Sequence, residues 1–509
     1  MDLTGAKVLA KAGLLNPIRP DRLLGMALAL ARWGLTPATG YAAGAARHPD
    51  RVAIIDDEGS LTYRELDQRT DRLAGELRAR GVLEGSAVGL LARNGRGFVE
   101  GSVAISKCGA DVLYLNTGSG GTQLAEVLHR EGADAVLHDA EFAELLAPSA
   151  PGKVMVTTEE LSALAATSTR EAPPKTGHAS RLVILTSGTT GAPRGAARSR
   201  ASIDDAASML SRIPLRAAET TFIASPVFHA WGLGHLTMAM LLGSTVVLHK
   251  KFDAARVLQA VEEHEASALV VVPVMLDLLL KADPAGFDLQ ALRVIASSGS
   301  ALPGVLATRV LDVFGPVLYN LYGSTEVAYA AVAGPEDLAA DPHTAGRPPY
   351  GVTLRIVDAA GEDVPDGTPG RVFVGSGLAF AGYTDGTDKD RLGALVATGD
   401  LGVFGAEGRL TVLGRDDDMV VIGGENVYPG QVEDALLGHP GVRECAVTAV
   451  PDETFGVSLV AHVVGEAEIE DLKARVRDGL ARFAVPRVFT FVEALPRNAT
   501  GKVLKRELA

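Results

Sequence analysis

A segment rich in glycine and hydroxyl side chains has the composition of a phosphate-binding loop. Residues 185–195 read Leu-Thr-Ser-Gly-Thr-Thr-Gly-Ala-Pro-Arg-Gly and follow an apolar run, 181–185, that is typical of a buried strand. Glycines let the backbone approach a ligand closely, and exposed N–H groups and hydroxyls form a concave anion site. Arg194 adds a permanent charge on a planar fork suited to phosphate. The residues expected to contact phosphate are Thr186, Ser187, Gly188, Thr189, Thr190, Gly191 and Arg194.

Two other interpretations of this segment are a Walker A loop and a flexible linker. The Walker A pattern does not fit, because the segment lacks a Gly-Lys-[Ser/Thr] ending. A linker is disfavoured because linkers rarely follow a buried strand directly. An anion site of a different type is therefore the chemistry that we expect here.

Four further motifs place charged, hydroxyl or aromatic side chains beside glycines. They are Tyr322-Gly-Ser-Thr-Glu326, Thr398-Gly-Asp400, Gly414-Arg-Asp-Asp-Asp418 and Pro496-Arg-Asn-Ala-Thr-Gly-Lys502. Each has a simpler explanation as well. Ser324 or Thr325 suits the N-cap of a helix, a lone Asp after Gly suits a turn, and the acidic run suits a solvated turn.

Together, the five motifs resemble in type and order those of the adenylate-forming superfamily, which includes acyl-CoA synthetases, peptide-synthetase adenylation domains and beetle luciferases. The resemblance covers nearly the whole chain. It is strongest to bacterial fatty-acyl-CoA synthetases, through Phe228-His-Ala-Trp-Gly232 and Gly423-Gly-Glu-Asn-Val-Tyr-Pro429. It implies that a carboxylate attacks the α-phosphate of ATP to give acyl-adenylate and pyrophosphate, and that the CoA thiol then displaces AMP. ATP, Mg²⁺ and coenzyme A are the expected cofactors.

The resemblance assigns the first half-reaction to two motifs. Lys502 is expected to bridge the carboxylate and the α-phosphate with its ammonium group. The alternative is a surface lysine beside Lys505 and Arg506. Glu326 is expected to ligate Mg²⁺, which favours carboxylate and phosphate oxygens, and Thr325 is expected to donate its hydroxyl to the α-phosphate.

Nucleotide binding and domain movement are expected at the remaining motifs. Tyr322 offers a flat face to adenine, Asp400 accepts both ribose hydroxyls, and Arg415 contacts ribose or phosphate. Asp417 is expected at the hinge about which the C-terminal domain rotates between half-reactions. The Gly299-Ser300-Ala301 turn follows a predicted strand and is expected to border the nucleotide.

The acyl group is expected to bind around residues 226–234, and CoA around residues 423–429. The resemblance places His229 beside the acyl carboxylate, where it gates the thiol tunnel, although a lone histidine in an apolar loop is more often structural. Gly423 and Gly424 would allow close approach of pantetheine. The segment 231–234 (Trp-Gly-Leu-Gly) suits a roomy hydrophobic pocket.

One departure from the family pattern leaves the reaction open. Arg194 stands where the usual loop has lysine, and guanidinium and ammonium groups are not equivalent. The leading hypothesis is an acyl-CoA ligase for a fatty or bulky hydrophobic carboxylic acid. The alternatives are an enzyme that mainly thioesterifies an acyl-adenylate from a partner enzyme, an acyl-AMP ligase that loads a carrier protein, and, least favoured, a non-catalytic binding protein.

Composition bounds the partners and the location. A net charge of −14 disfavours nucleic acid as a partner and suits a cytoplasmic enzyme. Two distant cysteines, Cys108 and Cys445, argue against a disulfide framework. Residues 23–35 are apolar but too short to cross a bilayer, so we expect a helix packed on the domain, or at most a peripheral membrane contact.

Alternating apolar runs and amphipathic stretches predict the elements that position these residues. Strands are expected at 52–55, 87–91, 268–272 and 294–296, and helices at 98–108 and 254–264, with Thr62 and Glu65 forming a capping box. This pattern indicates an α/β fold of layered sheets. We expect an N-terminal domain over 1–414, with a β-rich subdomain over about 350–414. A mobile α+β C-terminal domain is expected over 415–509, with strands near 445–450 and 458–464 and a helix near 468–483.

Overall fold

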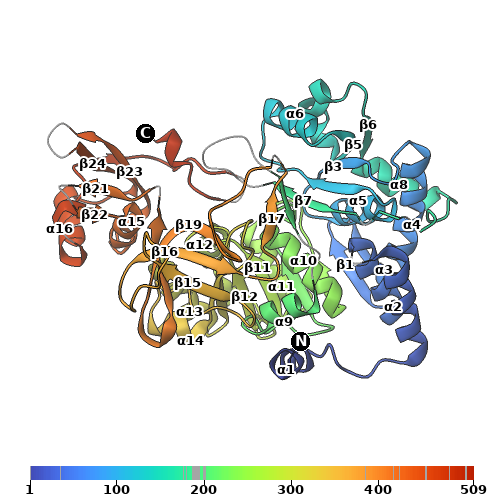
Figure 1. Ribbon diagram of the computed structural model, residues 1–509, viewed down its shortest axis with the longest axis horizontal. Helices are drawn as coiled ribbons and strands as arrows, with labels where there is room; N and C mark the ends of the chain where they lie inside the picture. The colour runs from blue at the N-terminus through green and yellow to red at the C-terminus, as the bar shows by residue number, and fades with distance from the viewer. Residues whose placement is uncertain are drawn as a thin grey trace.

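The chain forms a large N-terminal domain and a small C-terminal domain, both of mixed α/β structure (Figure 1). The computed structural model describes residues 2–508 except 35, 176, 179, 186–194, 199–201, 385, 417, 423–424, 453–455, 481 and 499–500. The predicted phosphate loop at 186–194, Asp417, Gly423 and Gly424 therefore lie outside the described residues. The predicted fold class is confirmed.

An eight-stranded sheet carries several strands that lead into the predicted site. Its order is β14 (Ala331–Ala333), β13 (Leu318–Tyr322), β12 (Val294–Ser297), β11 (Ala268–Val271), β9 (Thr220–Ile223), β10 (Thr245–Val247), β1 (Val52–Asp56) and β2 (Gly59–Thr62). The edge pairs β13–β14 and β1–β2 are antiparallel, and the pairs between them are parallel. Central parallel strands are buried on both faces, so β11 and β12 were readable as continuous apolar runs.

A seven-stranded sheet forms the other half of the N-terminal domain. Its order is β17 (Phe380–Tyr383), β8 (Gly195–Arg198), β7 (Leu182–Leu185), β4 (Asp111–Tyr114), β3 (Ala87–Leu91), β5 (Ala133–His138) and β6 (Val154–Thr157). β7 and β8 flank the predicted phosphate loop and pair antiparallel, with Leu185 opposite Gly195. β17 then adds to β8, which brings a segment from near residue 380 to this edge.

Helices cover these sheets and connect their strands. They are α1 (Leu3–Lys11), α2 (Pro20–Trp33), α3 (Pro37–Arg47), α4 (Tyr63–Ala79), α5 (Arg96–Lys107), α6 (Gly121–Arg130), α7 (Ala143–Leu146), α8 (Thr158–Thr167), α9 (Ile203–Leu210), α10 (Ala230–Leu242), α11 (Ala254–Glu263), α12 (Pro273–Lys281), α13 (Gly304–Phe314) and α14 (Pro335–Ala340). The predicted capping box is confirmed at the start of α4, where Glu65 N–H donates to the Thr62 hydroxyl and the Glu65 carboxylate accepts from Thr62 N–H.

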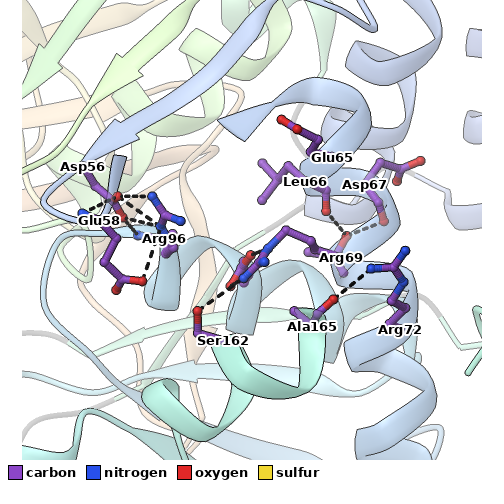
Figure 2. Close-up of polar contacts among 12 residues, drawn as sticks. Asp56, Glu58, Glu65, Leu66, Asp67, Arg69, Arg72, Arg96, Ser162 and Ala165 are labelled. Carbon is purple, nitrogen blue, oxygen red and sulfur yellow. Dashed lines mark hydrogen bonds and ion pairs between the residues drawn. The ribbon is translucent and has the colours of Figure 1, made fainter. Parts of the chain in front are cut away.

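Two buried ion pairs involve α5 and its neighbours α4 and β1 (Figure 2). Arg96 begins α5, directly after the seven-stranded sheet's β3, and donates to Asp56 at the end of β1 at 2.5 Å. Arg69 of α4 pairs with the fully buried Glu100 of α5. Removing one partner of such a pair leaves an uncompensated buried charge, at a cost of about 3–5 kcal/mol. The Arg96–Asp56 pair therefore holds β1 of the eight-stranded sheet against the start of α5, which follows β3 of the seven-stranded sheet.

A third sheet and the C-terminal domain complete the chain. The third sheet contains β15 (Thr353–Val357), β16 (Gly370–Gly375), β19 (Leu395–Phe404), β18 (Arg391–Leu392) and β20 (Leu410–Arg415). The C-terminal elements are β21 (Val420–Ile422), β22 (Glu425–Val427), α15 (Pro429–Leu437), β23 (Val442–Asp452), β24 (Gly456–Gly465), α16 (Ile469–Gly479) and β25 (Val488–Phe491). Figure 1 shows α15, α16 and β21–β24 gathered at one end of the molecule. The predicted helix near 468–483 ends at Gly479, so its last turn was placed wrongly.

Candidate functional site

A single cavity of about 2300 Å³ is lined by side chains from both domains. Ten of the predicted site residues border it: His229, Gly299, Ser300, Ala301, Tyr322, Thr325, Glu326, Asp400, Arg415 and Lys502. They come from the ends of β12 and β13, from the β19–β20 hairpin, from the start of α10 and from the last loop of the chain. Motifs separated by up to 273 residues, from His229 to Lys502, therefore meet in one place.

Tyr322, Asp400 and Arg415 form a connected polar group on one wall. Asp400 and Arg415 are direct partners across the antiparallel pair β19–β20, with 3.6 Å between Oδ1 and Nη1. The Tyr322 hydroxyl donates to Asp400 Oδ2 at 2.5 Å. Burial raises the pKa of Tyr322 well above its ordinary value, so this phenol stays protonated and continues to donate. Burial also raises the pKa of Asp400, against the hydrogen bond from Tyr322 and the nearby guanidinium.

Glu326 lies in a tight turn that the sequence reading did not anticipate. Ser324 Oγ accepts the N–H groups of Glu326 at 3.2 Å and Val327 at 3.4 Å, so it closes a turn, and the alternative of a capped helix is wrong. A Cβ on Gly323 would lie 2.2 Å from the Ala328 carbonyl oxygen, so glycine is required there.

Tyr383 orients the Glu326 carboxylate and was missed by sequence reasoning. Its hydroxyl donates to Glu326 Oε1 at 2.5 Å, and Phe380 N–H donates to the Glu326 carbonyl at 2.7 Å. Both residues belong to β17, which reaches Glu326 because it pairs with β8. The described residues contain no cluster of three or more metal-ligating side chains. One oriented carboxylate fits Mg²⁺ when phosphate oxygens and water supply its other ligands.

Lys502 reaches the cavity from a loop that its own backbone holds in place. Asn498 Oδ1 accepts the Lys502 N–H, and Asn498 N–H donates to the Lys502 carbonyl, each at 2.9 Å. Arg497 donates to the Gly501 carbonyl at 2.5 Å and pairs with Glu444 at 2.6 Å. The loop is thus fixed to the body of the C-terminal domain.

Close contact with the N-terminal domain places the Lys502 loop over the cavity. A Cβ on Gly501, where φ is +77°, would lie 2.4 Å from Val274 Cγ1 of α12. Burial lowers the pKa of Lys502, and the neighbouring Arg415 guanidinium lowers it further, while Asp418 and Asp400 oppose this. The Lys502 side chain therefore belongs to the polar wall formed by Asp400 and Arg415.

His229 sits at the N-cap of α10 on a segment that Asn94 secures. Asn94 Nδ2 donates to the carbonyls of Ile223 at 3.1 Å and Ser225 at 2.9 Å, and its Oδ1 accepts from Val227 N–H at 2.9 Å. Burial lowers the pKa of His229 to about 4, so the ring is neutral at pH 7. Asn94 carried no motif signal in the sequence, because its partners lie about 130 residues away.

The first turns of α10 form an apolar wall of the same cavity. Trp231, Leu233, Gly234 and Met238 line it. A Cβ on Gly234 would meet no atom within 4 Å, so this position faces open space. His235 is 1% exposed, and its Nδ1–H donates to the Trp231 carbonyl at 3.1 Å. Its pKa is lowered to about 4 by burial, so the His235 ring is neutral at pH 7.

Comparison with protein families identifies the family to which this chain belongs. The AMP-binding enzyme family matches residues 41–384, and the AMP-binding enzyme C-terminal domain matches residues 431–502. The chain belongs to the AMP-binding, adenylate-forming enzymes. The family predicted from the five motifs is therefore confirmed.

Individual relatives cover almost the whole chain. A feruloyl-CoA synthase from an Amycolatopsis species is 34% identical over 476 residues, which is 90% of this chain and 96% of the relative. A fatty acid–[acyl-carrier-protein] ligase from Streptomyces coeruleorubidus is 30% identical over 487 residues, covering 91% and 94%. The structure of o-succinylbenzoate CoA synthetase from Bacillus subtilis with its acyl-adenylate intermediate matches with a TM-score of 0.83 and 27% identity, covering 92% and 97%.

These relatives establish the reaction class of this AMP-binding enzyme. The same Bacillus subtilis synthetase, solved with ATP and magnesium, also matches with a TM-score of 0.83, at 27% identity over 92% of this chain and 98% of that one. This protein is an AMP-forming acid–CoA ligase that uses ATP, Mg²⁺ and CoA, and its substrate is an acyl or aryl acid. The predicted activity and cofactors are confirmed at this level.

Proposed function

We propose that this ligase activates a fatty or bulky hydrophobic carboxylic acid through its acyl-adenylate and transfers it to CoA. The observation that carries the proposal is the continuity of one cavity. Its polar wall bears Asp400, Arg415 and Lys502, and its other wall is the apolar start of α10. An acid bound with its chain against α10 would present its carboxylate to the polar wall.

Adenylation requires two anions to approach each other, and charge stabilisation is the main contribution of the protein. The Lys502 ammonium would bridge the attacking carboxylate and the α-phosphate, with the Thr325 hydroxyl as a second donor. Asp400 would accept the ribose hydroxyls while Tyr322 holds it in place. Arg415 would contact ribose or phosphate from the neighbouring strand. Catalysis of this kind needs positioning and no protein nucleophile.

Magnesium would bind at Glu326, whose carboxylate Tyr383 already orients. When bound, the ion neutralises phosphate charge. The Thr186–Thr190 hydroxyls, with Gly188 and Gly191 backbone groups and Arg194, are proposed to hold the remaining phosphates. These residues lie outside the described part of the chain, so their role rests on the sequence motif.

Thioesterification would need a second arrangement of the C-terminal domain. In the present arrangement Lys502 would lie against the acyl carboxylate, and it would have to withdraw before pantetheine could reach the acyl carbon. We place the hinge at Asp417 and the pantetheine contact at Gly423 and Gly424. His229, neutral at pH 7, would border the acyl carboxylate and open the thiol path when it moves.

Mass spectrometry of complete reactions tests the proposal. Each reaction contains ATP, Mg²⁺, CoA and one of a panel of fatty, aromatic and polycyclic acids. Carboxylate oxygens carry ¹⁸O. One ¹⁸O in AMP together with acyl-CoA for the hydrophobic acids supports the proposal. Equal use of short polar acids would refute the hydrophobic preference.

The same experiment tests two alternatives: transfer of the acyl group to a carrier protein, and thioesterification of an acyl-adenylate that a partner enzyme supplies. The similarity to a carrier-protein ligase favours including a holo-carrier protein in place of CoA. Reactions given synthetic acyl-adenylates in place of acid and ATP test whether arginine at position 194, where the usual loop has lysine, impairs adenylation. Acyl-CoA formed from the adenylates alone would mean that a partner enzyme supplies the adenylate.

A further inference from the structure

The outward face of α2 is apolar, and the described residues leave it uncovered. Figure 1 shows α2 at the edge of the molecule beside α3. The large side chains on this face are exposed by 46–61%: Leu23 55%, Leu24 61%, Leu28 60% and Leu30 46%. Ala27 and Ala31 are exposed between them. A surface helix normally turns polar residues outward, so this helix indicates a binding partner.

The inward face of α2 already packs on the domain. Ala29 and Trp33 are buried, and a Cβ on Gly25 would lie 2.9 Å from Ala46 Cβ of α3. Met26 borders the large cavity. The expectation that residues 23–35 form a helix packed on the domain thus holds for one face of the helix and fails for the other.

Charge around this face distinguishes between the partners. Residues 1–47 contain six basic side chains and two acidic ones, a net charge of +4 in a chain of net charge −14. Of the arginines on and beside α2, Arg19 and Arg32 are exposed at its two ends, whereas Arg22 and Arg47 are half-buried. The acidic Asp21 pairs with Arg19. A second copy docked on this face would bring two positive rims together, which is unfavourable.

We propose that the outward face of α2 binds the surface of an anionic lipid bilayer. The helix would lie in the membrane plane with its leucines below the headgroups, while the exposed Arg19 and Arg32, at its two ends, reach lipid phosphates. No helix among the described residues is long and apolar enough to cross a membrane, so the contact is peripheral.

This placement would also orient the cavity. Met26 of α2, together with Gly40 and Ala43 of α3, lines the cavity directly behind the lipid-binding face. A hydrophobic acid dissolved in the bilayer would then have a short path to the apolar wall of α10. This consequence rests on the proposed substrate, whereas the lipid contact itself does not.

Flotation with lipid vesicles tests the proposal on the full-length protein. The probes are phosphatidylglycerol–phosphatidylcholine vesicles and pure phosphatidylcholine vesicles at low and high salt. We expect binding to the anionic vesicles, at least tenfold weaker binding to neutral vesicles and weakening by salt. The doubly substituted Leu24→Glu, Leu28→Glu protein should lose at least tenfold in binding and keep its activity toward a water-soluble acid.

Matched substitutions separate this face from general hydrophobicity. Leu83→Glu and Val313→Glu change similarly exposed apolar residues, 51% and 54%, elsewhere on the surface, and should leave vesicle binding unchanged. Failure of the wild-type protein to bind anionic vesicles would overturn the proposal without any variant. A protein that does not bind vesicles but sediments as a dimer, and becomes monomeric on Leu24→Glu, Leu28→Glu substitution, would assign the face to a second copy instead. If the wild-type protein forms no acyl-adenylate, the proposed function is refuted and the lipid contact is not.

Discussion

Filling the open space at Gly234 should restrict the enzyme to shorter acids. A Cβ at this position meets no atom within 4 Å, and the residue lines the apolar wall of the cavity. The Gly234→Ala substitution adds one carbon atom that meets no neighbour, and Gly234→Val adds three carbon atoms at the same position. The space they take would be lost to the substrate.

The size of the effect follows from the apolar surface that the acid can no longer bury. Each excluded methylene costs about 0.8 kcal/mol, so valine should cost about 2.4 kcal/mol for an acid that fills the pocket. That corresponds to a roughly 50-fold loss in kcat/KM for the longest or bulkiest good substrate, since each ~1.4 kcal/mol is tenfold. An acid shorter by three or more carbons should be unaffected.

Steady-state kinetics over a homologous series of acids, with thermal unfolding alongside, provide the assay. Replacing a helical glycine with alanine stabilises a helix by about 0.5–1 kcal/mol, so the Tm of Gly234→Ala should not fall. Gly232→Ala is the matched control. Its Cβ would lie 2.4 Å from the Pro226 carbonyl oxygen, so it should lower Tm and impair all acids alike. Equal losses for short and long acids with Gly234→Val would refute the reasoning.

Three other outcomes follow from the geometry of the cavity. Gly501→Ala, which would press on Val274, should slow adenylation by at least tenfold and spare thioesterification of a supplied adenylate, as single-turnover assays of each half-reaction would show. Asp400→Asn should raise the KM for ATP about tenfold or more, because a hydrogen bond to a charged group contributes about 1.5–3 kcal/mol; an unchanged KM would argue against the ribose contact. The hydrogen bond from His343 to Asp434, with Nδ1 and Oδ2 3.4 Å apart, joins the two domains and raises the pKa of His343 above 6.5. The stabilisation of this domain arrangement is therefore fully present below pH 6.5 and lost as pH rises through the raised pKa. An exposed pair contributes at most about 1 kcal/mol, so the ratio between the populations of this domain arrangement and the others should change with pH by up to about fivefold. Energy transfer between labels on the two domains would measure this ratio, and His343→Gln should abolish its pH dependence.

The clearest local signal in the sequence was reliable, whereas contacts between distant segments were not predictable. The Thr62–Glu65 capping box depends on residues three apart, and the structure has it as expected. The hydrogen bond from Tyr322 to Asp400 spans 78 residues and depends on how β13 and β19, from different sheets, come together. The sequence identifies both residues through the family motifs but says nothing of their pairing.

Residues outside the motifs were the ones that sequence reasoning missed. Tyr383 contacts Glu326 because β17 adds to the far edge of the seven-stranded sheet, a pairing that no periodicity predicts. Asn94 acts through backbone groups of a strand and loop about 130 residues away. The apolar run at 23–35 predicts a helix, but which face is exposed depends on how α2 meets α3.

Separate measurement of the two half-reactions in Lys502→Ala tests the central claim most directly. The claim is that the loop at 496–502 brings an ammonium to the point where carboxylate and α-phosphate meet. Losing one such charge-stabilising donor should reduce acyl-adenylate formation by at least 100-fold. Thioesterification of a synthetic acyl-adenylate should stay within a fewfold of wild type, and the neighbouring Arg506→Ala should leave both halves intact. Equal loss of both half-reactions in Lys502→Ala, or normal adenylation, would contradict the account.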